Sequence, residues 1–283
     1  MSEHLAELLD LELAWRRVKL DYDSNRTFVT HPFLTDLVEL DRESWLRRLR
    51  HELASDAYQP SPPVSFPQPK GKWLVRPATM LWVDDEIVYA ALVGAALPHI
   101  ETALRWAQGD PDVSYQLSPD PGRPAWVRSD FRVWNEWRTR SLEKLGAAVQ
   151  FVAVADIAAF YENIDFARLL SYLREVGTDA EVLELLAKCL HTWSQPRDKG
   201  IPQGYSASDI LAKLYLLPVD QALKNEGYTH LRYVDDIRIF CGNLTAAKRS
   251  VPTPASTVGI WRRPCGPTSA RCSKIRADCG HIR

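Results

Sequence analysis

The segment His230–Phe240, which reads HLRYVDDIRIF, constrains the fold of this chain more than any other stretch. Apolar or aromatic residues alternate with polar ones on both sides of two adjacent carboxylates, Asp235 and Asp236. Such alternation predicts a strand, a tight turn and a second strand, with the acids at the tip. Adjacent carboxylates repel each other and resist desolvation, so we expect a cation, most simply a divalent metal ion, beside them. An ordinary β-turn is the alternative, because Asp also favours turns for backbone reasons.

Length and composition are those of a globular protein that buries a core. The 283 residues suffice for one large domain or for two lobes. Hydrophobic residues make up 46% of the chain and charged residues 25%, which is ordinary for a soluble protein. The formal net charge of −1 does not mark a nucleic-acid-binding protein, so any basic surface has to be local.

Neither a membrane segment nor an export signal is expected. No apolar run approaches the roughly 20 residues that span a bilayer. The start, MSEHLAELLDLE, is acidic where a signal peptide is basic, which predicts a cytoplasmic protein without membrane contact. Five cysteines, crowded toward the end of the chain, do not resemble a disulfide framework.

Residues 1–64 are predicted to be helical and then extended. Leucines recur at helical spacing within residues 2–22, and a second helix is predicted to begin at Asp41, a candidate N-cap. Five prolines between Tyr58 and Pro69 exclude helix and predict an extended connector. A short basic hairpin is predicted from Lys70 to Met80.

The middle of the chain alternates strands with helices. A helix over 126–146 mixes tryptophans with arginines, which suits nucleic acid and equally suits an amphipathic helix with one packed face. The elements predicted after it are a buried strand over 150–157, helices over 166–176, 180–194 and 206–224, and then the hairpin. Because that hairpin is antiparallel, the pattern favours an α+β fold over a doubly wound parallel sheet.

Residues 246–283 differ in composition from the rest of the chain. They show no helical or strand period, little acid, and frequent Pro, Arg and Cys. We therefore expect an irregular tail, non-native or disordered, and our hypothesis is out-of-frame translation after a frameshift. Translating the DNA in the other two frames tests it, because one frame should continue as an amphipathic helical segment. A zinc site is the alternative, but Cys265, Cys272, Cys279 and His281 lack a CxxC pair and suitable spacings.

Three stretches, in this order and at these separations, resemble the palm motifs of reverse transcriptases. They are Asp156 with an aromatic residue five positions later, the PQG loop within Ile201–Gly204, and Tyr233–Asp236 as the YxDD hairpin. Lys70–Lys72 with Arg76-Pro77 resembles the fingers segment of the same family. The resemblance covers about residues 65–245. It is greatest to bacterial enzymes of the group II intron, retron, and abortive-infection or phage-defence kinds.

The resemblance implies an α+β fold, the palm and fingers of a right-hand polymerase, with an antiparallel palm sheet and packed helices. It implies an RNA-directed DNA polymerase, a nucleotidyltransferase that uses an RNA template, a DNA or RNA primer and deoxynucleoside triphosphates. The implied cofactor is a pair of Mg²⁺ ions, with Mn²⁺ as a substitute. Two such ions activate the primer 3′-hydroxyl and neutralise the leaving pyrophosphate. Mg²⁺ prefers oxygen ligands, so carboxylates are the appropriate residues.

By resemblance, the catalytic residues are Asp156, Asp235 and Asp236. Asp156 and Asp235 are the expected bridging metal ligands, Asp236 assists, and the backbone carbonyl of Ile157 adds an oxygen.

The resemblance also implies contacts with the incoming nucleotide. Tyr161 is placed as the steric gate against a ribose 2′-hydroxyl, although a core aromatic is the alternative for this residue. Gln203 and Gly204 are expected under the nucleotide, where Gly permits close backbone approach, and Ile157 and Phe160 are expected to contact it.

Basic residues of the fingers segment are expected to hold the triphosphate. Arg76 does so with Lys70 or Lys72, because a guanidinium fork matches phosphate oxygens; a solvated hairpin is the alternative. The chain departs from the family at Lys213, where Asn is common, and we expect the helical thumb to be missing, which would leave the enzyme weak or inactive.

Three other functions stay open at this point. Template-independent or protein-primed DNA synthesis would use the same aspartates. A non-catalytic RNA-binding or assembly protein could keep a polymerase fold. A metal-dependent nuclease also uses clustered carboxylates, but would not need the PQG loop. The lack of maturase or endonuclease segments favours a role in antiphage defence, with a dedicated non-coding RNA or partner protein.

Overall fold

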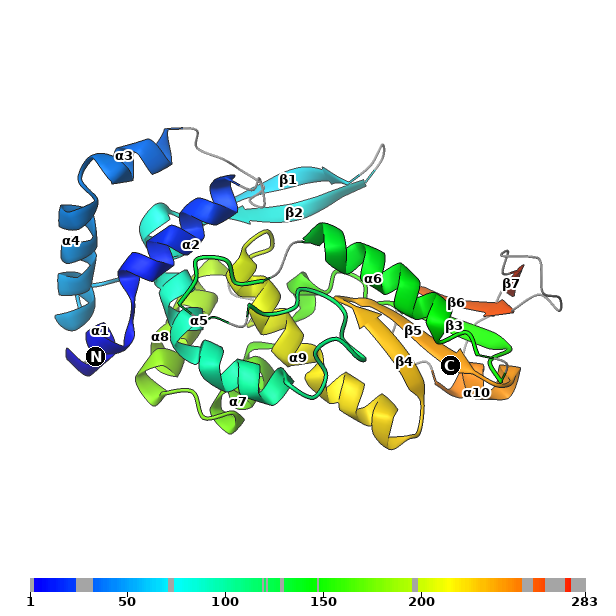
Figure 1. Ribbon diagram of the computed structural model, residues 1–283. Coiled ribbons are helices and arrows are strands. Elements are labelled where there is room, and N and C mark those ends of the chain that lie inside the picture. The colour runs from blue at the N-terminus through cyan, green and yellow to red at the C-terminus, as the bar shows by residue number, and fades with distance from the viewer. Residues whose placement is uncertain are drawn as a thin grey trace. The chain divides into compact units, whose positions relative to one another are not determined.

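The computed structural model describes residues 3–23, 33–70, 74–118, 120, 122–127, 130–146, 148–194, 198–250, 257–262 and 273–275 (Figure 1). The chain divides into two compact units. Unit 1 comprises Met1–Arg105, Leu117–Trp126 and Tyr161–Tyr215, and unit 2 comprises Trp106–Gln116, Val127–Phe160 and Leu216–Arg283.

Unit 1 is mainly helical. Its helices are α1 (Glu3–Leu8), α2 (Leu11–Asp23), α3 (Leu34–Leu40), α4 (Arg42–Ala54), α5 (Val83–Leu104), α7 (Phe166–Glu175), α8 (Ala180–Trp193) and the first half of α9 (Ser206–Asn225), with a 3₁₀ turn η1 (Tyr161–Asn163). The predictions of α7, α8 and α9 are confirmed to within a few residues.

One of the N-terminal predictions is wrong in detail, whereas the predicted N-cap position of Asp41 is confirmed. The helix predicted over 2–22 is two helices. α1 ends at Leu8, and the side chain of Asp10 accepts a hydrogen bond from the Leu13 backbone N–H (2.9 Å) as the N-cap of α2. Asp41 holds the N-cap position of α4, but its side chain makes no capping hydrogen bond. Its backbone N–H instead bonds the Val38 carbonyl and closes α3.

Helix α5 corrects the expectation about apolar length. Among the described residues it is the one helix long and apolar enough, by length and composition alone, to cross a membrane, at 22 residues. Most of its side chains are buried inside unit 1, where the helix packs against α2 and α8. Acidic residues fill its first turn, and two of them, Asp85 and Glu86, are buried and hydrogen-bonded to tyrosines. This is the burial of a core helix.

The proline-rich connector and the basic hairpin also differ from prediction. The hairpin begins earlier, with β1 (Val64–Lys70) pairing antiparallel with β2 (Leu74–Met80). The second half of the predicted connector is therefore a strand. Pro67 and Pro77 are register partners in this two-stranded sheet. Both strands are edge strands, which is where a sheet tolerates proline.

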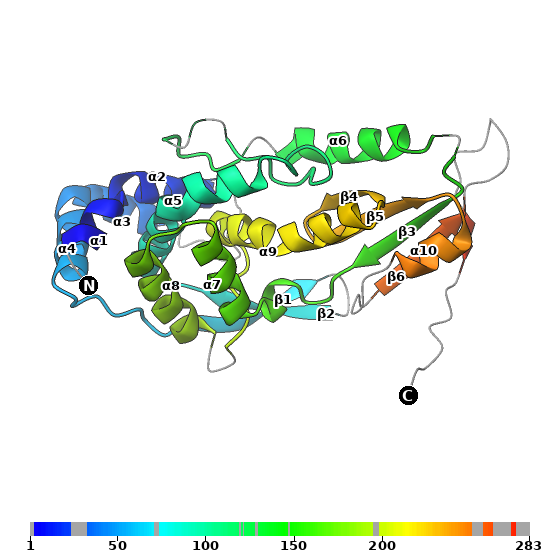
Figure 2. The same cartoon turned by 90° about the horizontal axis from the view of Figure 1, so that it is seen from below.

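Unit 2 is built on a five-stranded antiparallel sheet with the order β4-β5-β3-β6-β7 (Figures 1 and 2). Its strands are β3 (Phe151–Asp156), β4 (Thr229–Tyr233), β5 (Asp236–Cys241), β6 (Thr257–Arg262) and β7 (Ser273–Ile275), and its helices are α6 (Asp130–Glu143), α10 (Leu244–Arg249) and the second half of α9. The predicted strand over 150–157, the predicted hairpin and the α+β class are confirmed. The helix predicted over 126–146 is shorter at both ends.

The two faces of this sheet are covered by different helices. One face packs its buried residues against α9 and α10: they are Ala153, Ala155, Ile237 and Ile239, with Leu223 and Ala247 from the helices. The other face packs against α6 through a second cluster: Val152, Phe240 and Leu231, with Trp137 and Val113. The period of two along each strand therefore divides the core into two layers.

Two stretches of the tail differ from the irregular structure predicted for it. Residues Thr257–Arg262 pair along the whole length of β3, and Ser273–Ile275 pair with them in turn. The sheet edge formed by β3 supplies an unpaired backbone ladder that even a sequence without alternation can extend. The cysteines and the histidine considered for zinc lie outside the described residues.

Candidate active site

The two adjacent aspartates lie at the tip of the β4–β5 hairpin, as predicted. Tyr233 and Asp236 are register partners, so Val234 and Asp235 form a two-residue turn. Val234 has a φ of 54°, in the left-handed region that a β-branched residue rarely adopts. Such a conformation costs on the order of 1–3 kcal/mol and persists only when its surroundings hold it. The turn is therefore a strained segment that carries the candidate chemistry.

Asp156 lies directly opposite Asp236. It ends β3, and the two residues are register partners across the β3–β5 ladder. Residues opposite each other in an antiparallel pair share a face, with Cβ atoms about 4.5–5.5 Å apart. Burial and then the charge of Asp156 raise the pKa of Asp236 above its ordinary value, while Arg238 lowers it. The sheet thus brings together two carboxylates, and the charge of Asp156 disfavours the ionised form of Asp236.

This pair fits a hard divalent cation in its chemistry. Carboxylate oxygens are the ligands that Mg²⁺ prefers, and Mg²⁺ is commonly held by one or two carboxylates together with waters and substrate phosphates. Across the described ranges, His, Cys, Asp and Glu side chains nowhere gather in a group of three or more that could hold a metal ion. The register of Asp156 against Asp236 is what the sheet shows, and metal binding by Asp156, Asp235, Asp236 and the Ile157 carbonyl stays a prediction.

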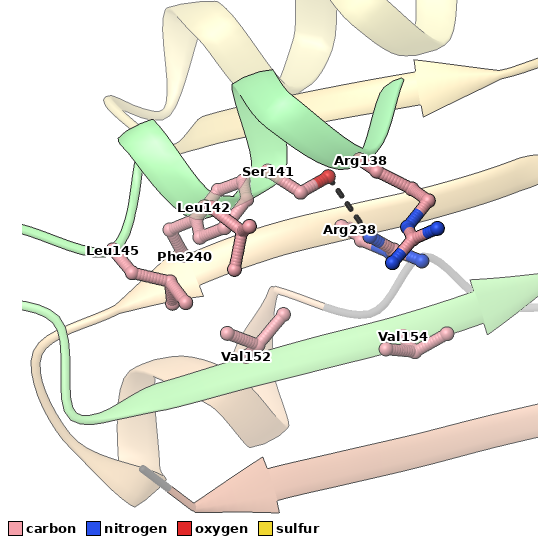
Figure 3. Close-up of a pocket in the computed structure, with 8 residues that line it drawn as sticks. All are labelled: Arg138, Ser141, Leu142, Leu145, Val152, Val154, Arg238 and Phe240. Atoms are coloured by element: carbon pink, nitrogen blue, oxygen red, sulfur yellow. Dashed lines mark hydrogen bonds between the residues drawn. The ribbon is translucent and has the colours of Figure 1, made fainter. Parts of the chain in front are cut away.

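A groove of about 430 Å³ lies on the same face of the sheet as the two aspartates. Along β3 and β5 the in-register pairs change from Val152–Phe240 to Val154–Arg238, and then to the aspartates. Figure 3 shows the groove between these strands and α6, with two arginine side chains, Arg138 and Arg238, at one end.

Arg238 is held in place at this groove. Its Nη1 donates a hydrogen bond to the Ser141 hydroxyl at 2.8 Å (Figure 3). Its guanidinium also lies 4.3 Å from the centroid of the Trp137 ring. Burial lowers the pKa of Arg238 and the Asp236 charge raises it. A fixed cation therefore stands two residues from the candidate metal ligand, on the same face.

A buried ionic cluster, which sequence reasoning missed, lies on the opposite face of the hairpin. Arg232 is fully buried, and its Nε lies 3.0 Å from each oxygen of Asp220, with Nη2 at 2.7 Å from Oδ2. Nη2 also lies 3.0 Å from Asp112 Oδ2, and Nη1 donates to the Val234 carbonyl at 3.2 Å. His230 joins the cluster through Asp220 at 3.1 Å. Burial alone would lower the pKa of Arg232, but Asp112 and Asp220 outweigh it and raise that pKa.

The sequence held a partial signal for this cluster. Period-two alternation places His230 and Arg232 on the same side as Ile237 and Ile239, which is the side facing α9. Two polar residues on an inward face predict buried partners. The partners themselves are distant in sequence, so their identity could not be predicted.

Unit 1 contains the predicted steric gate and the PQG loop. Tyr161 is buried, and its hydroxyl donates to Asp209 Oδ1 at 2.6 Å. Its carbonyl accepts from the Ile201 backbone N–H at 2.9 Å, so η1 and the loop are bonded to each other. Gly204 has a φ of 98°, which only glycine adopts without strain.

A pocket of about 380 Å³ in unit 1 joins this loop to the β1–β2 hairpin. Gln203 lines it together with Thr79 of β2. The Tyr205 hydroxyl connects the same elements, because it accepts from the Leu81 N–H at 2.9 Å and donates to the Thr79 carbonyl at 3.2 Å. The predicted nucleotide-contacting loop and the fingers segment are thus neighbours within unit 1.

Other predicted residues are described only in part. Lys72 lies outside the described residues, as do the side chains of Lys70 and Arg76, whose backbones pair with Leu74 and Gln68. Phe160 is buried in unit 2, and Lys213 is buried in α9. The aspartates belong to unit 2, whereas Tyr161, Gln203, Gly204 and the basic hairpin belong to unit 1.

The chain is similar to known proteins over a region that includes these motifs. A family model described as reverse transcriptase (RNA-dependent DNA polymerase) matches residues 75–259. No curated protein matches the chain. Among solved structures, the apo telomerase from Candida tropicalis, truncated from the C-terminal domain, is 13% identical with a TM-score of 0.44, covering 73% of this chain and 50% of that one. A partial Cas6-RT-Cas1–Cas2 complex is 17% identical with a TM-score of 0.45, covering 83% of this chain and 38% of that one. The chain spans half or less of the length of these two structures.

Proposed function

Because this chain belongs to the reverse transcriptase (RNA-dependent DNA polymerase) family, a family of nucleotidyltransferases, we propose that it copies an RNA template by adding deoxynucleotides to a primer 3′-hydroxyl. The α+β architecture agrees with a palm in unit 2 and fingers elements in unit 1. The observation that carries the proposal is the register of Asp156 against Asp236 beside the YVDD turn.

The proposed cofactor is a pair of Mg²⁺ ions, for which Mn²⁺ can substitute. Asp156, Asp235, Asp236 and the Ile157 carbonyl would hold the ions, which supply activation of the 3′-hydroxyl and neutralisation of the leaving pyrophosphate. The half-buried, mutually repelling pair supports this role, because a cation relieves the repulsion that raises the pKa of Asp236.

The remaining contacts are proposed for the primer and the incoming nucleotide. A guanidinium matches phosphate oxygens, so Arg138 and Arg238 give the groove beside the aspartates a place for the primer backbone. Gln203 and Gly204 would lie under the nucleotide, with Ile157 and Phe160 beside it, and Arg76 with Lys70 or Lys72 would bind the triphosphate.

Tyr161 is proposed as the gate that excludes ribonucleotides. Its hydroxyl is fixed by Asp209, so the ring is held in one position. Replacing Tyr161 with Ala should admit ribonucleotides into the product, and Tyr161→Phe, which keeps the ring, should not. An active Tyr161→Ala variant with unchanged sugar discrimination would show that the residue is a core aromatic instead.

Primer extension on an RNA template tests the proposed activity directly. The wild-type chain should extend a labelled primer when Mg²⁺ is present, and Asp235→Asn should not. Equal incorporation by the two proteins would contradict the role in metal binding that is proposed for Asp235. Sequencing the product separates templated from template-independent or protein-primed synthesis. RNA binding without any Mg²⁺-dependent synthesis would identify a non-catalytic RNA-binding protein.

We also propose a biological setting, which rests on the resemblance to bacterial enzymes. The chain would act in the cytoplasm in antiphage defence, together with a dedicated non-coding RNA or a partner protein. Bacteria that express the wild-type gene should reduce phage plating efficiency relative to bacteria that express Asp235→Asn. Equal plating would contradict the defence role without affecting the proposed chemistry.

A further inference from the structure

The strained turn that contains Val234 and Asp235 accepts a hydrogen bond from one buried side chain, that of Arg232. Val234 keeps a left-handed backbone although it is β-branched, so some contact has to fix its peptide. In the described structure, the Val234 carbonyl accepts a hydrogen bond from Nη1 of Arg232, two residues earlier, at 3.2 Å. This contact joins the turn to the ionic cluster beneath it.

The guanidinium of Arg232 cannot move freely, because two carboxylates anchor it. Asp220 binds it through both Nε and Nη2, and Asp112 binds Nη2 as well. Nη1 then faces the turn. A planar guanidinium held on one side by carboxylates presents its remaining N–H groups in a fixed direction.

The anchors are themselves fixed to other parts of unit 2. Asp220 lies in the second half of α9, at 0% exposure. Asp112 accepts from both the Ser114 backbone N–H at 2.9 Å and the Ser114 hydroxyl at 2.5 Å. The loop that contains Asp112 is bonded to β4 by two backbone hydrogen bonds, between Val113 and Arg232 and between Arg232 and Pro111, each 2.9 Å.

We propose that Arg232 is a positioning residue for the aspartate hairpin: by fixing the Val234 peptide, it holds Asp235 and Asp236 in the orientation in which they bind divalent cations. The inference rests on the proposed function for the identity of the cation. Outer groups that orient metal ligands typically contribute about 10- to 100-fold in metal affinity or activity. Lys cannot replace Arg232 here, because one ammonium cannot span two carboxylates and a carbonyl in a fixed plane.

His230 provides a matched control. It is buried, lies on the same strand and face as Arg232, and bonds the same carboxylate, Asp220, at 3.1 Å. Within the described part of the chain, the side chain of His230 makes its hydrogen bond to Asp220 and none to the turn. A variant at His230 therefore disturbs the cluster without removing the hydrogen bond to Val234.

The experiment measures Mn²⁺ binding to the purified protein without nucleotide or primer, by titration, alongside thermal unfolding. Arg232→Lys should weaken Mn²⁺ binding about ten-fold or more, whereas His230→Gln should change it less than about two-fold, although both lower the unfolding temperature. Asp112→Asn, which loosens one anchor, should give an intermediate loss and serves if Arg232→Lys does not fold.

A second pair of variants separates positioning from general stability. Glycine adopts a left-handed backbone without strain, so Val234→Gly removes the need for an external contact. Combined with Arg232→Lys, it should recover at least about three-fold of the lost Mn²⁺ affinity, as a positive coupling in a double-mutant cycle. A role in stability alone predicts no recovery.

Three results would overturn the proposal: Mn²⁺ binding unchanged in both Arg232→Lys and Asp112→Asn, an equal loss in His230→Gln, or no recovery on adding Val234→Gly. Each of these is independent of DNA synthesis. If the wild type binds Mn²⁺ and shows the expected pattern but makes no DNA, the proposed polymerase activity fails while the positioning role stands.

Discussion

The two faces of the unit 2 sheet are made from the same strands, yet they serve different ends. The face toward α9 and α10 is apolar along its whole length in β3 and β5, through Ala153, Ala155, Ile237 and Ile239. The face toward α6 changes from apolar to charged over three in-register pairs and ends at Asp156 and Asp236. Both faces bury apolar residues that stabilise the fold, but only the face toward α6 also holds two like charges together in β3 and β5. The predictions below test this division.

The largest effect is expected at the charged end. Asp156→Asn removes one of two opposed carboxylates and should lower primer extension by at least about a thousand-fold, which is about 4 kcal/mol of transition-state stabilisation. The fold should be intact, because Asn is isosteric and relieves the repulsion with Asp236. Rates measured on protein with a wild-type circular dichroism spectrum test this. Activity within ten-fold of wild type would contradict a catalytic role for the face that ends at Asp156 and Asp236.

Substitutions on the face toward α9 and α10 should lower stability and leave activity unchanged. Ile239→Ala, at a fully buried position, should lower the free energy of unfolding by about 2–4 kcal/mol through lost burial and a cavity. Val154→Ala, on the groove face and only partly buried, should cost about 1 kcal/mol or less. Urea unfolding measures both. Folded Ile239→Ala protein should extend primers normally at low temperature, and a selective loss of its activity would contradict the division.

The pH dependence of synthesis should depend on Arg238. Arg238 lowers the pKa of Asp236 against the raising effects of burial and Asp156. Removing its charge in Arg238→Gln therefore raises that pKa, so Asp236 is protonated at higher pH and binds a cation less well there. The acid limb of the pH–rate profile should move to higher pH, and Arg238→Lys, which keeps the charge, should leave it nearer the wild-type position. An unmoved limb in Arg238→Gln would exclude this coupling.

The smallest effect is a gain in stability. Because the folded-state pKa of Asp236 is raised, its ionised form destabilises the fold at neutral pH, and this cost disappears as the pH falls and the group is protonated. Asp236→Asn should therefore raise the unfolding temperature at pH 7, and the gain in the free energy of unfolding should be less than about 1 kcal/mol because the group is half exposed. The difference should vanish near pH 3. A lower unfolding temperature at pH 7 would show that the Asp236 charge is stabilised by its surroundings.

Sequence patterns within a short segment predicted the helices and strands that this segment forms by itself. The strand β3, the hairpin and helices α7 to α9 follow from the period of apolar residues, and their bounds agree within a few residues. The predictions were incomplete where other parts of the chain decide: Asp41 also closes α3, and the second half of the proline-rich connector is a strand because it pairs with β2.

The candidate site likewise contains residues that the sequence predicts and residues that it does not. The places of the aspartates, at the end of β3 and at the tip of the hairpin, could be predicted because their motifs are short and contiguous. The cluster around Arg232 could not, because its anchors come from a loop and a helix that sequence alone does not bring together. Polar residues on an inward strand face signal that partners exist, but only the fold identifies them.

The brevity of the β4–β5 turn limits how this hairpin can vary in length. Val234 and Asp235 are the whole connection, so there is no slack in which to absorb an insertion. One extra residue at the start of β5 would slide the strand by a single step and exchange its sides. The carboxylate of residue 236 would then point into the aliphatic layer beneath α9, and the inserted residue would lie opposite Asp156. An insertion that shifts β5 by one residue in this way would therefore remove Asp236 from its position opposite Asp156.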